Sequence, residues 1–202
     1  WRQFWKKARY SLVENKISEI EYYVLIGKKE DAVVVLNELT ADYREDSNTQ
    51  YAKAMVGVSQ GKSDESITIL TKLLETDKKN ETYLRLLAKV QTYSGNPSGA
   101  SQSYSDLIDM GIVDAGLFLL RAECYSKTGE TDKAVKDVNK FIELYPGSKA
   151  ALSFAGRLEA QSGDNLKALD YFSRNLKLHP NDPECYIDRA NSYFVSKTWN
   201  YA

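Results

Sequence analysis

Residues 115–148 read AGLFLLRAECYSKTGETDKAVKDVNKFIELYPGS and contain two amphipathic segments separated by a glycine. Apolar side chains recur at three- and four-residue spacing in both segments, which predicts two helices that each have one apolar face. Gly129 suits the left-handed backbone conformation that often follows a helix. We expect the second helix to begin near Thr131 and to end before Pro146, because the residue before a proline disfavours helical backbone angles. Neither helix covers its apolar face alone, so stability requires stacking against neighbouring helix pairs.

The same pattern recurs along the chain with a period of 34 residues. Glycines stand at this interval at Gly27, Gly61, Gly95, Gly129 and Gly163. The same period carries a series of small residues five positions later: Ala32, Ser66, Ala100, Ala134, Ala168 and Ala202. Seven residues before the glycine position the residue is also small, with Ile20 as the exception: Ala54, Ala88, Ala122, Gly156 and Ala190. Two small-residue series let paired helices approach closely, so the chain is predicted to be an array of helix pairs.

This helix–turn–helix repeat resembles the tetratricopeptide repeat. The resemblance implies an all-α fold, a right-handed superhelical solenoid of antiparallel helix pairs. Five complete repeats and one partial repeat are expected, at residues 13–46, 47–80, 81–114, 115–148, 149–182 and 183–202. Four positions depart from the family's pattern: Gly57, Lys78, Ile112 and Asn175.

Residues 1–12 lie outside the repeat register and carry an apolar stripe with basic residues on the other faces. We interpret them as a lead-in helix that caps the open end of the first repeat, because a solenoid end needs cover. The alternative is an amphipathic helix that binds a membrane surface or a partner. Membrane contact is expected only through this segment, since the apolar runs elsewhere are too short to span a bilayer.

The composition of the chain argues against several classes of function. The chain has 202 residues, is 43% hydrophobic and has a net charge of −1, which fits a folded array and gives no basic field for nucleic acid. Cys124 and Cys185 are scattered and His179 is the one histidine, whereas a zinc site typically takes four nitrogen or sulfur ligands. A glycine-containing stretch at 57–63 lacks the spacing of a phosphate-binding loop. We predict no metal, no cofactor, no catalytic residue and no enzymatic activity.

In the family that the chain resembles, first helices line the concave surface, and positions 2, 5, 9, 12 and 13 of a repeat face a ligand. Carried over to this chain, these positions give the candidate partner-binding residues Tyr51, Met55, Arg85, Lys89, Tyr93, Glu123, Lys127 and Arg157. Cations predominate and aromatic or apolar residues lie near them, which predicts a bound protein or peptide segment that is partly acidic and partly apolar. The alternative is that these are ordinary solvated charges on an empty inner face.

Chaperone-binding members of this family hold an acidic tail with a carboxylate clamp of two Asn, one Lys and one Arg. The corresponding positions of repeats four to six hold Glu123, Phe154, Glu184 and Asp188, and those of repeats two to four hold Met55, Leu86, Gly116 and Leu120. We therefore predict that the chain has no heat-shock chaperone clamp.

The resulting hypothesis is a non-catalytic scaffold or adaptor that binds a partner segment in its concave groove. The alternative is a structural subunit of a larger assembly, for example in a cell envelope, that uses the solenoid ends and convex face. The Tyr-rich composition of the repeats is similar to that of bacterial repeat proteins, many of them exported. It favours a location in the periplasm or cell envelope over one in the cytoplasm.

Overall fold

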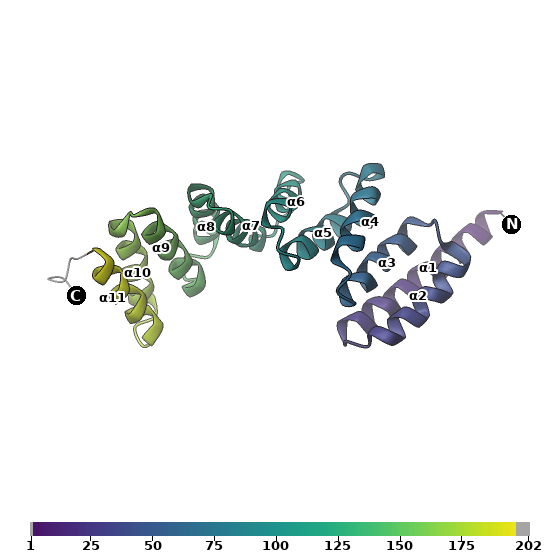
Figure 1. The fold of residues 1–202 in the computed structure, drawn as a ribbon, viewed down its shortest axis with the longest axis horizontal. Helices are drawn as coiled ribbons and strands as arrows, with labels where there is room; N and C mark the ends of the chain where they lie inside the picture. Colours follow the sequence, from purple (N-terminus) through teal and green to yellow (C-terminus); the bar gives the residue numbers. More distant parts are fainter. Residues whose placement is uncertain (1, 197–202) are drawn as a thin grey trace. The chain divides into compact units, whose positions relative to one another are not determined.

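The computed structural model describes residues 2–196, and this part of the chain consists of helices without strands (Figure 1). In chain order the helices are α1 (Arg2–Leu25), α2 (Lys29–Tyr43), α3 (Ser47–Ser59), α4 (Ser63–Thr76), α5 (Glu81–Tyr93), α6 (Pro97–Asp109), α7 (Gly116–Lys127), α8 (Thr131–Leu144), α9 (Lys149–Ser162), α10 (Asn165–Leu178) and α11 (Pro183–Ser196). The described residues form two compact halves, an N-terminal half that ends at residue 106 and a C-terminal half that begins at residue 107. The border lies inside α6.

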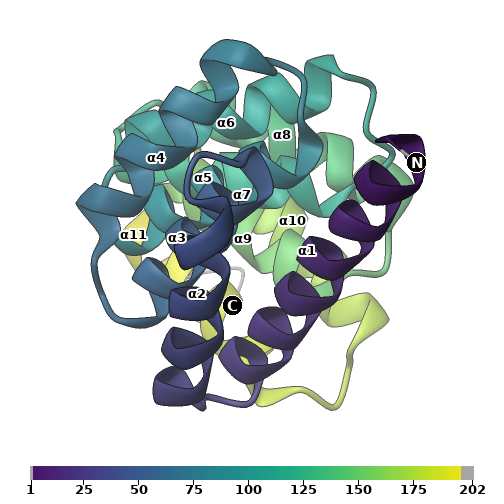
Figure 2. The same ribbon diagram turned by 90° about the vertical axis from the view of Figure 1, so that its right-hand side faces the viewer.

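Each half is built from helix pairs, which confirms the predicted all-α fold class. In the N-terminal half α1 packs on α2 and α3 on α4, and in the C-terminal half α7 packs on α8 and α9 on α10. Figure 2 shows α1 and α2 side by side. Helix α1 continues through residues 12 and 13, so the lead-in segment and the first helix of the first repeat share one continuous helix.

The repeated glycines adopt the backbone conformation that the sequence predicts. Gly129 has a φ of +79°, and the other glycines of the 34-residue series also have positive φ. The turn at Gly129 reverses the chain between α7 and α8 while the amide of Glu130 donates a 2.8 Å hydrogen bond to the carbonyl of Tyr125. The glycine thereby lets the turn satisfy a carbonyl at the end of the first helix.

The small residues lie where paired helices meet. Ala32, Ala100, Ala134 and Ala168 are fully buried, as are Ala54, Ala88 and Ala122 of the other series. One departure from the repeat pattern, Gly57, makes room for Ser66, because a Cβ on Gly57 would lie 2.6 Å from the Ser66 hydroxyl. That hydroxyl donates a 2.9 Å hydrogen bond to the carbonyl of Ala54, so the pair substitutes a polar contact for ordinary apolar packing.

A second departure, Asn175, is fully buried in the C-terminal half. Its side-chain amide donates to the hydroxyl of Ser153 at 2.9 Å and to the carbonyl of Lys149 at 3.2 Å. Hydrogen bonds of this kind make a buried polar residue tolerable. Asn175 therefore ties α10 to α9 at a position where the family pattern has an apolar residue.

The C-terminal half also contains a largely buried ion pair between α7 and α8. Arg121 donates two hydrogen bonds of 2.7 Å, from Nε and Nη2, to the two carboxylate oxygens of Asp137. The guanidinium also lies 5.8 Å from the ring centroid of Tyr125. Hydrogen bonding to Asp137 raises the pKa of Arg121. The pair joins the two helices of the fourth repeat.

Candidate partner-binding cleft

A cleft lies over the first helices of the N-terminal half, where α1, α3 and α5 pack in succession. It consists of two adjoining pockets that share Tyr51 and Thr82, with volumes of about 500 and 290 Å³. The larger, which we call the acidic pocket, is lined by Glu14, Asn15, Ile17, Ser18, Glu21, Asn48, Tyr51, Asn80, Thr82 and Tyr83. The smaller, the basic pocket, is lined by Tyr51, Glu81, Thr82, Arg85, Leu86 and Lys89.

The lining follows the 34-residue register. Position 2 of the first three repeats supplies Glu14, Asn48 and Thr82, and position 5 supplies Ile17, Tyr51 and Arg85. Position 9 supplies Glu21 from α1 and Lys89 from α5. Stacked repeats place equivalent side chains side by side, so two or three residues from each first helix form one continuous lining.

Tyr51 occupies the junction between the two pockets. Its ring is half-buried and lies 5.5 Å from the ring of Tyr83, centroid to centroid, at an interplanar angle of 32°. Burial raises the pKa of the Tyr51 phenol, and the negative charge of Glu21 raises it further. The phenol therefore stays protonated at neutral pH and offers an aromatic face together with a hydroxyl group.

The basic pocket is formed by one face of α5. Arg85 Nε donates a 2.8 Å hydrogen bond to Glu81, one turn earlier on the helix, which holds the guanidinium at the pocket wall. Lys89 is exposed, and no carboxylate of the described residues pairs with it. Tyr93 is 76% exposed and lies beyond the residues that line the pocket. Arg85 and Lys89 can together bind a carboxylate. Tyr93 can contact a ligand only where that ligand extends beyond the pocket.

Met55, predicted as a groove residue, belongs to the core instead. Its side chain is 8% exposed and lies in the cluster that contains Val13 and Ile20. The flexible thioether fills core space that a charged residue at the same repeat position could not enter. We therefore remove Met55 from the candidate residues.

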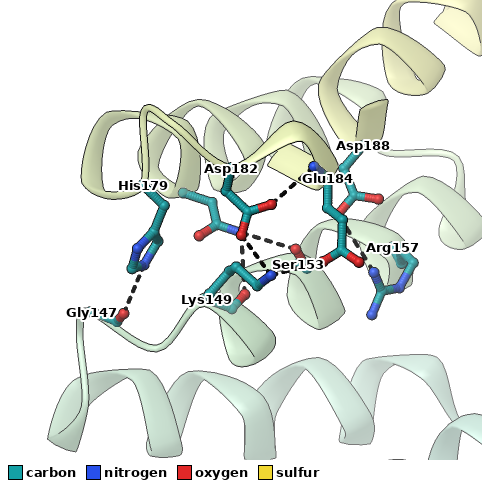
Figure 3. Close-up of polar contacts among 9 residues, drawn as sticks. Gly147, Lys149, Ser153, Arg157, His179, Asp182, Glu184 and Asp188 are labelled. Atoms are coloured by element: carbon teal, nitrogen blue, oxygen red, sulfur yellow. Dashed lines mark hydrogen bonds and ion pairs between the residues drawn. The ribbon is translucent and has the colours of Figure 1, made fainter. Parts of the chain in front are cut away.

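The remaining candidates belong to the C-terminal half. Glu123 and Lys127 are exposed on α7. Arg157 on α9 lies 3.5 Å from the carboxylate of Asp188 on α11 (Figure 3). The structure thus brings Tyr51, Arg85 and Lys89 together in one cleft and places Arg157 in an ion pair of the other half.

A second charge network ties α9 to the start of α11. Lys149 Nζ donates to Asp182 at 2.7 Å and to Glu184 at 2.8 Å, and Figure 3 shows the two carboxylates converging on it. These hydrogen bonds raise the pKa of Lys149, and the bond from Lys149 lowers the pKa of Asp182. Lys149 and Arg157, both on α9, are therefore paired with carboxylates of the same half.

Glu14 and Glu21 are cleft residues that the sequence prediction missed. They occupy positions 2 and 9 of the first repeat, the same positions that identified candidates in the second and third repeats. Applying the rule to residues 13–46 would have found both. The prediction drew its candidates from the later repeats and so overlooked the acidic wall that α1 supplies.

Within residues 2–196, no three His, Cys, Asp or Glu side chains are grouped so as to hold a metal ion. His179 Nε2 lies 3.1 Å from the carbonyl of Gly147, a contact that joins two loops (Figure 3). Cys124 and Cys185 are both buried. None of the helices described combines the length and apolarity needed to span a bilayer.

Comparisons with known sequences agree with the repeat register. Residues 117–148 match the tetratricopeptide repeat model. DnaJ homolog subfamily C member 3 of Gallus gallus is 26% identical over 179 residues, which cover 81% of this chain and 35% of that protein. Hsp70-Hsp90 organizing protein 1 of Glycine max is 32% identical over 85 residues, which cover 42% of this chain and 15% of that protein. The chain spans about a third or less of the length of these relatives.

Solved structures share the fold at low sequence identity. YrrB, described as a TPR protein with an unusual peptide-binding site, has a TM-score of 0.72 at 17% identity, with 87% of this chain and 90% of YrrB covered. A tetratricopeptide repeat protein from Parabacteroides merdae has a TM-score of 0.72 at 22% identity, with 92% and 73% covered. The helix pairs and these matches agree: residues 117–148 are similar to the tetratricopeptide repeat, and the fold is that of tetratricopeptide repeat proteins.

Proposed function

We propose that this chain is a non-catalytic scaffold or adaptor whose N-terminal cleft binds a segment of a partner protein. The observation that carries the proposal is that Tyr51, Arg85 and Lys89, from two successive first helices, line one cleft. Because the cleft is formed by packed helices, the scaffold loses little conformational entropy on binding. Most of the entropy loss is that of the partner segment.

The chemistry of the basic pocket suits a segment with a carboxylate and an apolar side chain. Arg85 is held at the pocket wall by Glu81, and Lys89 adds an exposed ammonium. Tyr51 can pack against an apolar side chain and still offer its hydroxyl. Anchors of this kind typically supply most of the binding free energy of an interface.

The relatives support a binding role for the repeats. One relative's name describes the organisation of two chaperones, and the YrrB title describes a peptide-binding site. The absence of a heat-shock clamp stays a prediction for this chain. It is supported by Glu184 and Asp188, which stand at clamp positions of the sixth repeat and already pair with Lys149 and Arg157.

Two further points complete the proposal. The adaptor role needs no chemistry from the lining residues, and the absence of enzymatic activity stays a prediction. The comparisons favour an adaptor over a structural subunit of a larger assembly. A location in the bacterial periplasm or cell envelope stays a prediction from the composition of the sequence.

The test is affinity capture from the native source with the wild-type chain and with an Arg85→Glu/Lys89→Glu variant. The matched control is Lys72→Glu/Lys78→Glu, which makes the same charge change at exposed lysines of α4 and the following loop. Circular dichroism checks that all three proteins have the same helicity. Partners captured by the wild type and the control but lost with the cleft variant support the proposal. Partners retained by the cleft variant overturn it.

A further inference from the structure

The charge of the residues that line the cleft of the N-terminal half changes from one end of the cleft to the other. The acidic pocket contains the carboxylates of Glu14 and Glu21, which lie seven residues apart on one face of α1. Neither carboxylate pairs with a cation in the part of the chain whose side chains are described. The acidic pocket contains no cation, so its lining carries two negative charges.

The other end of the cleft has the opposite sign. In the basic pocket Glu81 offsets one of the two cations Arg85 and Lys89, which leaves a net charge of +1. Between the two ends the lining is uncharged, with Tyr51, Tyr83 and Thr82. From α1 to α5 the surface therefore runs from negative through aromatic to positive.

We propose that the cleft takes an extended partner segment that carries a basic residue, a central apolar residue and an acidic residue in line. The inference rests on the proposed function and deepens it, because it replaces a partly acidic segment with one of mixed charge. The basic residue would face Glu14 and Glu21, the apolar residue would pack on Tyr51, and the acidic residue would face Lys89 and Arg85.

The geometry also sets the spacing of the two charges. Packed helices lie about 8–10 Å apart, so two steps from α1 to α5 cover roughly 16–20 Å. An extended chain rises about 3.3 Å per residue, so about five or six residues separate the basic and acidic side chains. An all-acidic segment would instead bring like charges to the α1 wall, where repulsion opposes binding.

The experiment is selection of segments from a random 12-residue peptide library displayed on phage, on the wild-type chain and on Glu14→Gln/Glu21→Gln. A matched control, Glu30→Gln/Glu45→Gln, removes two exposed carboxylates that do not line the cleft. The wild type and the control should enrich peptides with the basic–apolar–acidic order at five- or six-residue spacing. The affinity of the best peptide should fall roughly tenfold on Glu14→Gln/Glu21→Gln and by a similar factor on Arg85→Gln/Lys89→Gln.

The outcomes separate the two proposals. Enriched peptides that are purely acidic, that bind equally to the wild type and to Glu14→Gln/Glu21→Gln, and that weaken on Arg85→Gln/Lys89→Gln overturn the mixed-charge inference and leave the proposed function standing. Peptides that neither cleft variant weakens, or a selection without enrichment, overturn both. Peptides weakened by both cleft variants but not by the control support both.

Discussion

The cleft of the N-terminal half and the α9–α11 face of the C-terminal half use the same repeat positions in opposite ways. Glu21 and Arg157 both stand at position 9 of a first helix. Arg157 meets Asp188, at position 6 of the next repeat, whereas the residue at that place after Glu21 is the uncharged Ala52. A charge at position 9 is therefore available to a ligand only when the following repeat provides no opposite charge.

This difference separates charges that hold the array together from charges that can recognise a partner. On the α9–α11 face, Lys149 and Arg157 are paired within the half. In the cleft, Glu14, Glu21 and Lys89 have no ion-pair partner among the side chains described. A ligand gains little affinity from a charge that is already paired within the protein. An unpaired charge can add both affinity and specificity.

The largest effect is expected from the buried pair of the C-terminal half. Asp137→Ala should lower the free energy of unfolding by about 3–5 kcal/mol, because it leaves Arg121 largely buried without its counter-charge. In the N-terminal half, Glu81→Ala removes the partner of Arg85 at an exposed site and should cost less than about 1 kcal/mol. Urea unfolding followed by circular dichroism measures both. Equal losses for the two variants would contradict the distinction between the two ion pairs.

A smaller effect is expected from the Lys149 network. Lys149→Ala removes the bridge to Asp182 and Glu184, so the amides of α11 should exchange hydrogen faster while those of α5 are unaffected. Lys89→Ala is the matched control and should leave exchange in α5 unchanged, because Lys89 has no ion-pair partner among the described residues. Hydrogen exchange read by mass spectrometry resolves the two helices. Unchanged exchange in α11 would show that the bridge contributes nothing to its docking.

The same network predicts a pH dependence. The hydrogen bond from Lys149 lowers the pKa of Asp182 in the folded chain, so its contribution to stability is present above the unfolded pKa of about 3.9 and is lost as pH falls through the folded value. The raised pKa of Lys149 means that its contribution is lost only in strongly alkaline solution. The protection factors of the α11 amides, which are the ratios of intrinsic to observed exchange rate, should therefore fall below about pH 4.

Asp182→Asn is the control for this titration. It removes the titrating carboxylate, so the acid-induced change in α11 should become smaller than in the wild type. An acid response of the same size in both proteins would assign the change to other groups.

The sequence predicted the fold almost completely because each repeat encodes it locally. Gly129 and its equivalents end first helices through positive φ, and the small residues at Ala122 and Ala134 set close helix packing wherever they recur. These signals depend on nearby residues, so the helix ends and the helix pairing can be predicted from a single repeat.

The site could be predicted only in part, because a side chain's exposure depends on the repeat beside it. The position rule located Tyr51, Arg85 and Lys89 in the cleft but could not tell that Met55 turns into the core. Nor could it tell that Arg157 would meet Asp188. Both outcomes depend on which residue stands opposite, a non-local property that a single repeat does not contain.

The smallest effect is expected from neutralising the cleft itself. Glu21→Gln and Lys89→Gln should each change the free energy of unfolding by less than about 0.5 kcal/mol, since neither charge supports a fold contact among the residues described. The prediction is checked by urea unfolding beside Asp137→Ala as the positive control. A loss comparable to that of Asp137→Ala would mean that the cleft charges stabilise the array, and the contrast between the two halves would disappear. Unchanged stability together with weakened peptide binding would instead mean that these charges serve the partner and not the fold.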